Sequence, residues 1–128
     1  MKLLLDTHIW IWSKGDPERL GRRVRTELSN PNNELWLSPV SVWEALALMQ
    51  KGRIRMENPF AWVERAAEQM HEAPLTREIV SIGLALPLPH ADPADRFLAA
   101  TAKVLKLTLV TADKRLLGLG EIASLANR

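Results

Sequence analysis

One stretch of the sequence decides the fold: HADPADRFLAATA, residues 90–102. Asp92 followed by Pro93 predicts a helix start, because an aspartate accepts hydrogen bonds from first-turn amides and proline is tolerated at the first helical position. In a helix that runs to about Lys106, Asp95 shares a face with apolar residues. Either Asp95 complements the positive end of the helix dipole, or it points into a site where carboxylates converge.

The length and composition indicate a single globular domain over residues 1–128. The chain is 47% hydrophobic and 25% charged, and its 128 residues are enough to bury a stable core without disulfide bonds. It contains no cysteine, which excludes disulfides, thiolate metal sites and a cysteine nucleophile. The net charge of +2 is small, so a nucleic-acid partner has to be met by local basic patches.

No apolar run approaches the roughly eighteen residues of a membrane span. Asp6 also interrupts the N-terminal leucine run too early for a signal peptide. We therefore expect a cytoplasmic protein with no membrane partner.

Short apolar runs alternate with helical segments, which predicts parallel βαβ units. The expected class is α/β, a three-layer fold with a mainly parallel central sheet and helices on both faces. Buried strands are predicted at 2–5, 35–37 and 107–110, with a last strand around 122–125. Helices or helical turns are predicted at 9–12, 16–29, 41–51, 58–71, 76–86, 93–106 and 114–117.

Several side chains receive structural assignments from these patterns. The helix at 41–51 is apolar on all sides and should be buried, and Ser41 with Glu44 matches a capping box. The helix from Asn58 should bury a stripe that begins at Phe60 and includes Val63, Ala67 and Met70, with His71 as a solvated cap at its end. Trp36 is expected in the core.

The predicted topology brings four carboxylates to one edge of the sheet. Asp6 directly follows the first strand, and Asp113 with Thr111 follows the third. Glu44 lies about a turn beyond the second strand, and Asp95 begins the helix that feeds the third. Because ligands bind outside the carboxyl ends of parallel strands, these acids should share one site.

Such a cluster is unfavourable as bare anions. Two charges about 5 Å apart repel by roughly 3 kcal/mol at an effective dielectric constant of about 20. The acids therefore either hold protons or surround a cation. Oxygen ligands without cysteine or a helical histidine pair favour Mg²⁺ or Mn²⁺, and such an ion suits phosphodiester hydrolysis.

Four motifs in this order resemble a PIN domain, more narrowly the VapC type of toxin ribonuclease. They are LLDTH at 4–8, LSPVSVWE at 37–44, PHADPADR at 89–96 and LVTAD at 109–113. The resemblance runs from Leu3 to about Leu117, and the tail lacks the aromatic-tipped final strand that the family leads one to expect.

The resemblance implies a PIN-like fold and a catalytic, metal-holding quartet of Asp6, Glu44, Asp95 and Asp113, with Thr111 as a polar helper. It also implies endonucleolytic cleavage of RNA dependent on Mg²⁺ or Mn²⁺, a homodimer, and inhibition by a VapB-like antitoxin that threads into the site.

Other residues receive supporting assignments. Asp92 is interpreted first as the helix cap and second as a metal ligand, Thr7 as a supporting residue, and Arg96 as a group that steadies an acid or touches phosphate. His8 and His90 flank the site, where a general base is conceivable. Trp43 is assigned to the core or a dimer contact, and Trp10 and Trp12 to contacts with a second subunit or the antitoxin. Candidates for RNA backbone contact are Arg22, Arg23, Arg25, Arg53, Arg55, Lys114 and Arg115.

Two other enzyme or signalling classes fit poorly. A receiver domain needs an acidic pair after the first strand and an aspartate after a middle strand, and a haloacid dehalogenase-type phosphatase needs an aspartate where His8 stands. A non-catalytic PIN-like module that binds RNA or protein stays open as the alternative to a nuclease.

Overall fold

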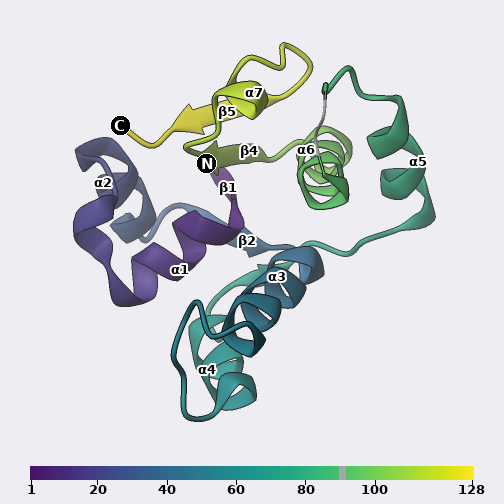
Figure 1. Cartoon of the computed structure of the whole chain (residues 1–128). Coiled ribbons are helices and arrows are strands. Elements are labelled where there is room, and N and C mark those ends of the chain that lie inside the picture. Colours follow the sequence, from purple (N-terminus) through teal and green to yellow (C-terminus); the bar gives the residue numbers. More distant parts are fainter. Residues whose placement is uncertain (90–91) are drawn as a thin grey trace.

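A parallel sheet forms the middle layer of the computed structural model, which describes residues 1–89 and 92–128 (Figure 1). The described residues form five strands in the order β3-β2-β1-β4-β5, and every neighbouring pair is parallel. The strands are β1 (Lys2–Leu5), β2 (Glu34–Leu37), β3 (His71–Glu72), β4 (Thr108–Thr111) and β5 (Ala123–Ala126). The predicted α/β class with a parallel sheet is confirmed.

Helices cover both faces of this sheet. They are α1 (Thr7–Gly15), the 3₁₀ turn η1 (Pro17–Arg19), α2 (Arg22–Ser29), α3 (Pro39–Gln50), α4 (Pro59–Ala66), α5 (Arg77–Ala85), α6 (Pro93–Leu105) and α7 (Lys114–Leu117). Figure 1 shows α1 and α2 on one side of the sheet and α5 and α6 on the other. None of the helices in the described part of the chain has the length and hydropathy to cross a bilayer.

Successive residues of β1 and β4 pack alternately into two hydrophobic cores. Leu4 and Leu109 face a cluster with α5 and α6, whereas Leu3, Leu5 and Val110 face a cluster with α1 to α4. All five side chains are at most 1% exposed. The apolar runs of β1 and β4 therefore belong to strands buried on both faces, as the sequence predicts.

The segment around His71 differs from the prediction. Helix α4 ends at Ala66 rather than continuing to His71, and His71 lies instead on the short strand β3, paired with Trp36 of β2. The two rings stack with centroids 4.9 Å apart. A strand of two residues carries no alternation of apolar and polar residues, so sequence periodicity could not reveal it.

The predicted single helix over 16–29 is wrong, because the chain breaks at Leu20 and Gly21. Leu20 and Gly21 are extended, Gly21 is the N-cap of α2, and its N–H donates to Asn127 Oδ1 at 2.7 Å. A Cβ on Gly21 would lie 1.8 Å from the carbonyl oxygen of Arg128. The C-terminal segment therefore sets this break, and a local pattern does not show it.

Several burial predictions also need correction. Phe60 is predicted to pack inward and Trp43 to lie in the core or in a dimer contact, yet they are 72% and 69% exposed. Phe60 therefore does not pack inward, α3 is not buried on all sides, and the dimer contact of Trp43 stays a prediction. Trp36 is only partly buried against the core. Trp10 is fully buried and donates from its indole nitrogen to the Ala66 carbonyl at 3.0 Å, so it is not available to a second subunit or an antitoxin. Val63 does pack against the core as predicted, as do Ala67 and Met70.

Candidate active site

Asp6 stands at the junction of β1 and α1. Its Oδ1 accepts from the Thr7 N–H at 2.8 Å, which caps α1, and its Oδ2 accepts from the Thr111 hydroxyl at 2.6 Å. Thr111 is buried at the end of β4, next to β1 in the sheet, and its Oγ1 also accepts from the Asp113 N–H at 3.0 Å. The carboxyl ends of two neighbouring strands thus place Asp6 and Asp113 around one threonine.

Glu44 reaches the site from α3 through Thr7. The buried Thr7 hydroxyl lies 2.9 Å from Ser41 Oγ and donates to Glu44 Oε1 at 2.5 Å. The predicted capping box is therefore wrong. Helix α3 starts earlier, at Pro39, and Ser38 caps it by accepting from the Val40 N–H at 3.1 Å.

The dipeptide Ser38-Pro39 repeats the cap-then-proline pattern of Asp92-Pro93, so the sequence did hold the signal for the true start of α3. The role of Ser41 as a buried partner of Thr7 had no such signal, since the contact joins residues 34 positions apart.

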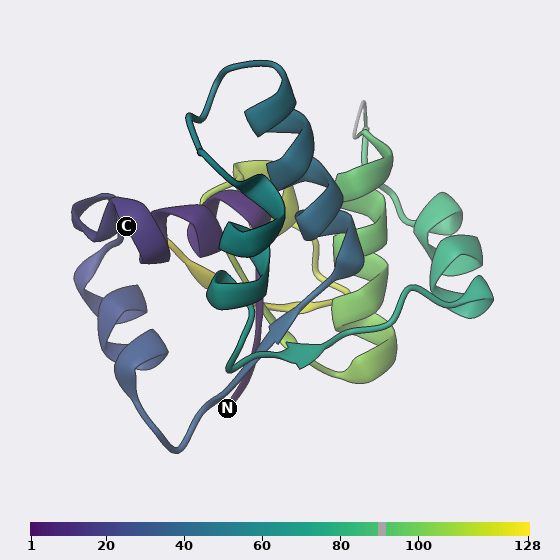
Figure 2. The same ribbon diagram turned by 90° about the horizontal axis from the view of Figure 1, so that it is seen from below.

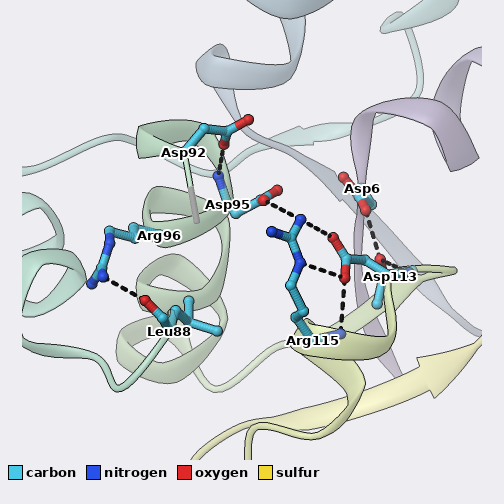
Figure 3. Close-up of polar contacts among 8 residues, drawn as sticks. Asp6, Leu88, Asp92, Asp95, Arg96, Asp113 and Arg115 are labelled. Carbon is cyan, nitrogen blue, oxygen red and sulfur yellow. Dashed lines mark hydrogen bonds and ion pairs between the residues drawn. The ribbon is translucent and has the colours of Figure 1, made fainter. Parts of the chain in front are cut away.

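Asp92 and Asp95 occupy the first turn of α6. Asp92 Oδ1 accepts from the Asp95 N–H at 3.0 Å, which confirms the predicted cap (Figure 3). The Asp95 side chain is 17% exposed and points toward Asp113 (Figure 3). Figure 2 shows α3 alongside α6, and Glu44 and Asp92 line the same groove between these helices.

Asp113 caps the short helix α7 and pairs with Arg115. Its Oδ1 accepts from the Arg115 N–H at 2.8 Å and from Nε at 3.2 Å, while Oδ2 accepts from Nη2 at 2.8 Å. The same Nη2 lies 3.3 Å from Asp95 Oδ2 (Figure 3). Arg115, which the sequence offered as an RNA contact, bridges two acids of the predicted quartet.

Burial and mutual repulsion disturb the titration of these acids. Burial, with added repulsion from Asp92, Asp6 and Asp113, raises the pKa of Asp95 to about 6. Burial also raises the pKa of Asp6 and of Glu44, against the hydrogen bonds from Thr111 and Thr7. The Arg115 guanidinium lowers the pKa of Asp113. The acids therefore lie close enough to repel one another.

The side chains do not form a closed ligand cage. Within residues 1–89 and 92–128, no group of three or more histidine, aspartate or glutamate side chains is arranged to hold one metal ion. Arg115 bonds to two of the acids that such a group would need.

Asp95 makes the stability of the metal-free protein depend on pH. Its folded pKa of about 6 lies above the ordinary value of 3.8, so between these pH values the folded chain binds more protons than the unfolded chain. Lowering the pH from about 7 to about 5 should therefore stabilise the fold, by about 1 kcal/mol after allowance for solvent screening. Thermal unfolding in chelator measures this, and Asp95→Asn should flatten the slope. A wild-type slope of opposite sign, or one that Asp95→Asn leaves unchanged, contradicts it.

Arg96 serves a different purpose from the one predicted. Its guanidinium donates to the carbonyls of Gly83, Leu86 and Leu88 at 3.0, 2.9 and 2.6 Å, and to that of Leu84 at 3.3 Å. Figure 3 shows it directed away from Asp95, toward Leu88. The interpretation that Arg96 steadies an acid or touches phosphate is wrong, because carbonyls at the end of α5 and in the chain that follows bind its Nη1 and Nη2.

The remaining predicted residues lie outside this network. His8 is exposed beside the acids with its ring 5.7 Å from Trp12, and His90 lies outside the described residues. Lys114 is exposed next to Asp113. The other candidate RNA contacts are exposed on α2 or in the loop after α3: Arg22, Arg23, Arg25, Arg53 and Arg55.

Comparisons with known proteins agree with this architecture. A family model described as a PIN domain matches residues 3–122. Ribonuclease VapC22 of Mycobacterium tuberculosis (strain ATCC 25618 / H37Rv) is 32% identical over 116 residues, which cover 89% of this chain and 88% of that protein.

Two solved structures share the fold at lower identity. One is a chain of VapBC2 from Rickettsia felis, in a structure bound to a DNA fragment from the VapBC2 promoter. It has a TM-score of 0.79 at 16% identity, and all of both chains is covered. A chain of DNA-bound VapBC from Salmonella typhimurium gives 0.72 at 19% identity, with 98% of each chain covered.

Proposed function

The chain belongs to the PIN domain family and has a VapC-type relative, and from this premise we propose that it is an endoribonuclease dependent on Mg²⁺ or Mn²⁺. It acts as the toxin of a toxin–antitoxin pair, as a single domain over residues 1–128. The observation that supports the proposal is a chain of contacts among acids: Thr111 links Asp6 to Asp113, and Arg115 links Asp113 to Asp95. Burial raises the pKa of Asp6, Glu44 and Asp95, and each of the three is also repelled by a neighbouring acid.

The chemistry of the donors fits a hard divalent cation, although the four side chains are not arranged as a closed ligand cage in this structure. The four acids offer only carboxylate oxygens, which Mg²⁺ and Mn²⁺ prefer, and their mutual repulsion falls when a cation joins them. We assign metal binding and catalysis to these four acids, with Asp92 as an additional candidate ligand. When bound, such an ion lowers the pKa of a water molecule and neutralises charge on phosphoryl oxygens.

Two threonines position the acids for this role. Thr111 donates to Asp6 and accepts from the Asp113 N–H, so it sets the spacing between the ends of β1 and β4. Thr7 donates to Glu44 and fixes α3 against α1. Exposed basic side chains neutralise the RNA backbone, and we propose Arg22, Arg25, Arg53, Lys114 and Arg115 for this contact.

An apolar groove beside the acids suits a protein partner. It has a volume of about 590 Å³ and is lined by Val40, Trp43, Leu75 and Phe97, among others, with Glu44 at its border. We propose that a VapB-like antitoxin covers this groove and the acids. A homodimer would cover further exposed apolar side chains, Phe60 among them.

Incubation with total cellular RNA tests the proposed activity. With Mn²⁺ present, the wild type should produce discrete new ends, mapped by sequencing, and Asp6→Asn should produce none while it still caps α1, because asparagine also accepts from the Thr7 N–H. Asp16→Asn, the same change at the other end of α1, serves as the matched control and should cleave like the wild type. RNA binding without cleavage by the wild type would favour the non-catalytic alternative.

A further inference from the structure

Arg115 supplies the positive charge inside the acid cluster. Its Nη2 lies 2.8 Å from Asp113 Oδ2 and 3.3 Å from Asp95 Oδ2, so one nitrogen holds oxygens from two acids together. Within the described part of the chain, it is the side chain whose cationic group pairs with acids of the quartet. The Arg115 guanidinium therefore offsets part of the repulsion between these carboxylates.

The bridge is built so that it can open. The Arg115 side chain is 48% exposed, which weakens its ion pairs through solvent screening. Helix α7 keeps its cap when the guanidinium leaves, because Asp113 Oδ1 also accepts from the Arg115 backbone N–H. The side chain can therefore swing into solvent while Asp113 stays in place.

We propose that Arg115 is a built-in counter-ion of the acid site that competes with the divalent cation for Asp95 and Asp113. The inference rests on the proposed function for the metal, and it adds a residue that limits how tightly the metal binds. The guanidinium and a divalent cation neutralise the same negative charges and repel each other, so each weakens the binding of the other to Asp95 and Asp113. Metal binding is therefore expected to displace Arg115 toward solvent.

Mn²⁺ binding measured by titration calorimetry tests the competition without any RNA. Arg115→Ala should bind Mn²⁺ about tenfold more tightly than the wild type. Arg115→Lys keeps the charge but loses the planar fork that reaches two acids, so its affinity should fall between the two. Lys114→Ala removes the same charge from the neighbouring residue of α7 and should change the affinity by less than about threefold, because it only alters the screened field.

Two outcomes overturn the proposal. The first is that Arg115→Ala binds Mn²⁺ no more tightly than the wild type does. The second is that Lys114→Ala binds Mn²⁺ as tightly as Arg115→Ala does. If the wild type binds Mn²⁺ and the variants give either of these results, only the inference about Arg115 fails. If no variant binds Mn²⁺, the metal-dependent function fails with it.

A spectroscopic readout follows the release directly. The arginine Nε–H signal that disappears in Arg115→Lys identifies this residue in a nitrogen–proton spectrum. Addition of saturating Mg²⁺ should move that signal toward the position of a solvent-exposed arginine. A signal that stays in place while the Asp95 and Asp113 amides shift would show that the bridge survives metal binding and would refute the competition.

Discussion

Asp95→Asn is expected to lower RNA cleavage by roughly a thousandfold and, at the same time, to raise the melting temperature of the metal-free protein. The two effects have one cause. Asp95 is the acid whose pKa is raised to about 6 by burial and by repulsion from Asp92, Asp6 and Asp113. Near neutral pH the ionised Asp95 side chain destabilises the fold, whereas the proposed metal site needs its negative charge.

The stabilisation should be on the order of 1–2 kcal/mol, or roughly 3–7 °C in melting temperature for a domain of this size. Asparagine keeps the shape of the side chain and an oxygen that can accept from Arg115 Nη2, so the gain reflects the removed charge rather than repacking. Glu68→Gln, the same charge change at an exposed side chain outside the site, should shift the melting temperature by less than about 1 °C.

Magnesium separates the two proteins further. At a concentration a hundred times its dissociation constant, Mg²⁺ should stabilise the wild type by about 2.7 kcal/mol through mass action. Asp95→Asn lacks one of the assigned ligands and should gain little. Thermal unfolding with chelator and with Mg²⁺ measures both effects, and equal magnesium shifts in the two proteins would contradict the assignment of Asp95 as a ligand.

The sequence revealed the parts of the fold that depend on local patterns. Apolar residues identified β1 and β4 because strands buried on both faces place apolar side chains at successive positions, here Leu3-Leu4-Leu5 and Leu109-Val110. The tail strand β5 lies within one residue of its prediction, and α7 spans the predicted 114–117. The Asp92 cap was confirmed because its signal lies within four residues.

The parts that the sequence missed depend on contacts between distant residues. The break at Gly21 follows from the C-terminal Arg128, and the position of Glu44 follows from a bond to Thr7, 37 residues away. Arg115 illustrates the same limit within the site. The sequence makes it a candidate for RNA contact, and only the fold brings its Nη2 to 3.3 Å from Asp95 Oδ2, 20 residues away along the chain.

Arg96 gives the largest expected effect on stability. Its guanidinium satisfies the carbonyls of Gly83, Leu86 and Leu88, three buried residues at the end of α5 and in the chain that follows. Arg96→Ala leaves these oxygens without their donor, and an orphaned buried carbonyl costs about 1–3 kcal/mol. Allowing for water that reaches part of the loop, we expect a loss of about 2–4 kcal/mol, or roughly 6–15 °C in melting temperature.

Arg96→Lys distinguishes the geometry from the charge. An ammonium cannot match a planar fork that serves three carbonyls, so lysine should recover less than about half of the loss although it keeps the charge. Chemical denaturation and thermal unfolding compare the stability of the wild type, Arg96→Lys and Arg96→Ala. Arg77→Ala, which removes an exposed arginine of α5, serves as the control. If Arg96 instead bound the RNA backbone, Arg96→Ala would keep the wild-type melting temperature and weaken RNA binding, since a phosphate contact contributes nothing to the folded state alone.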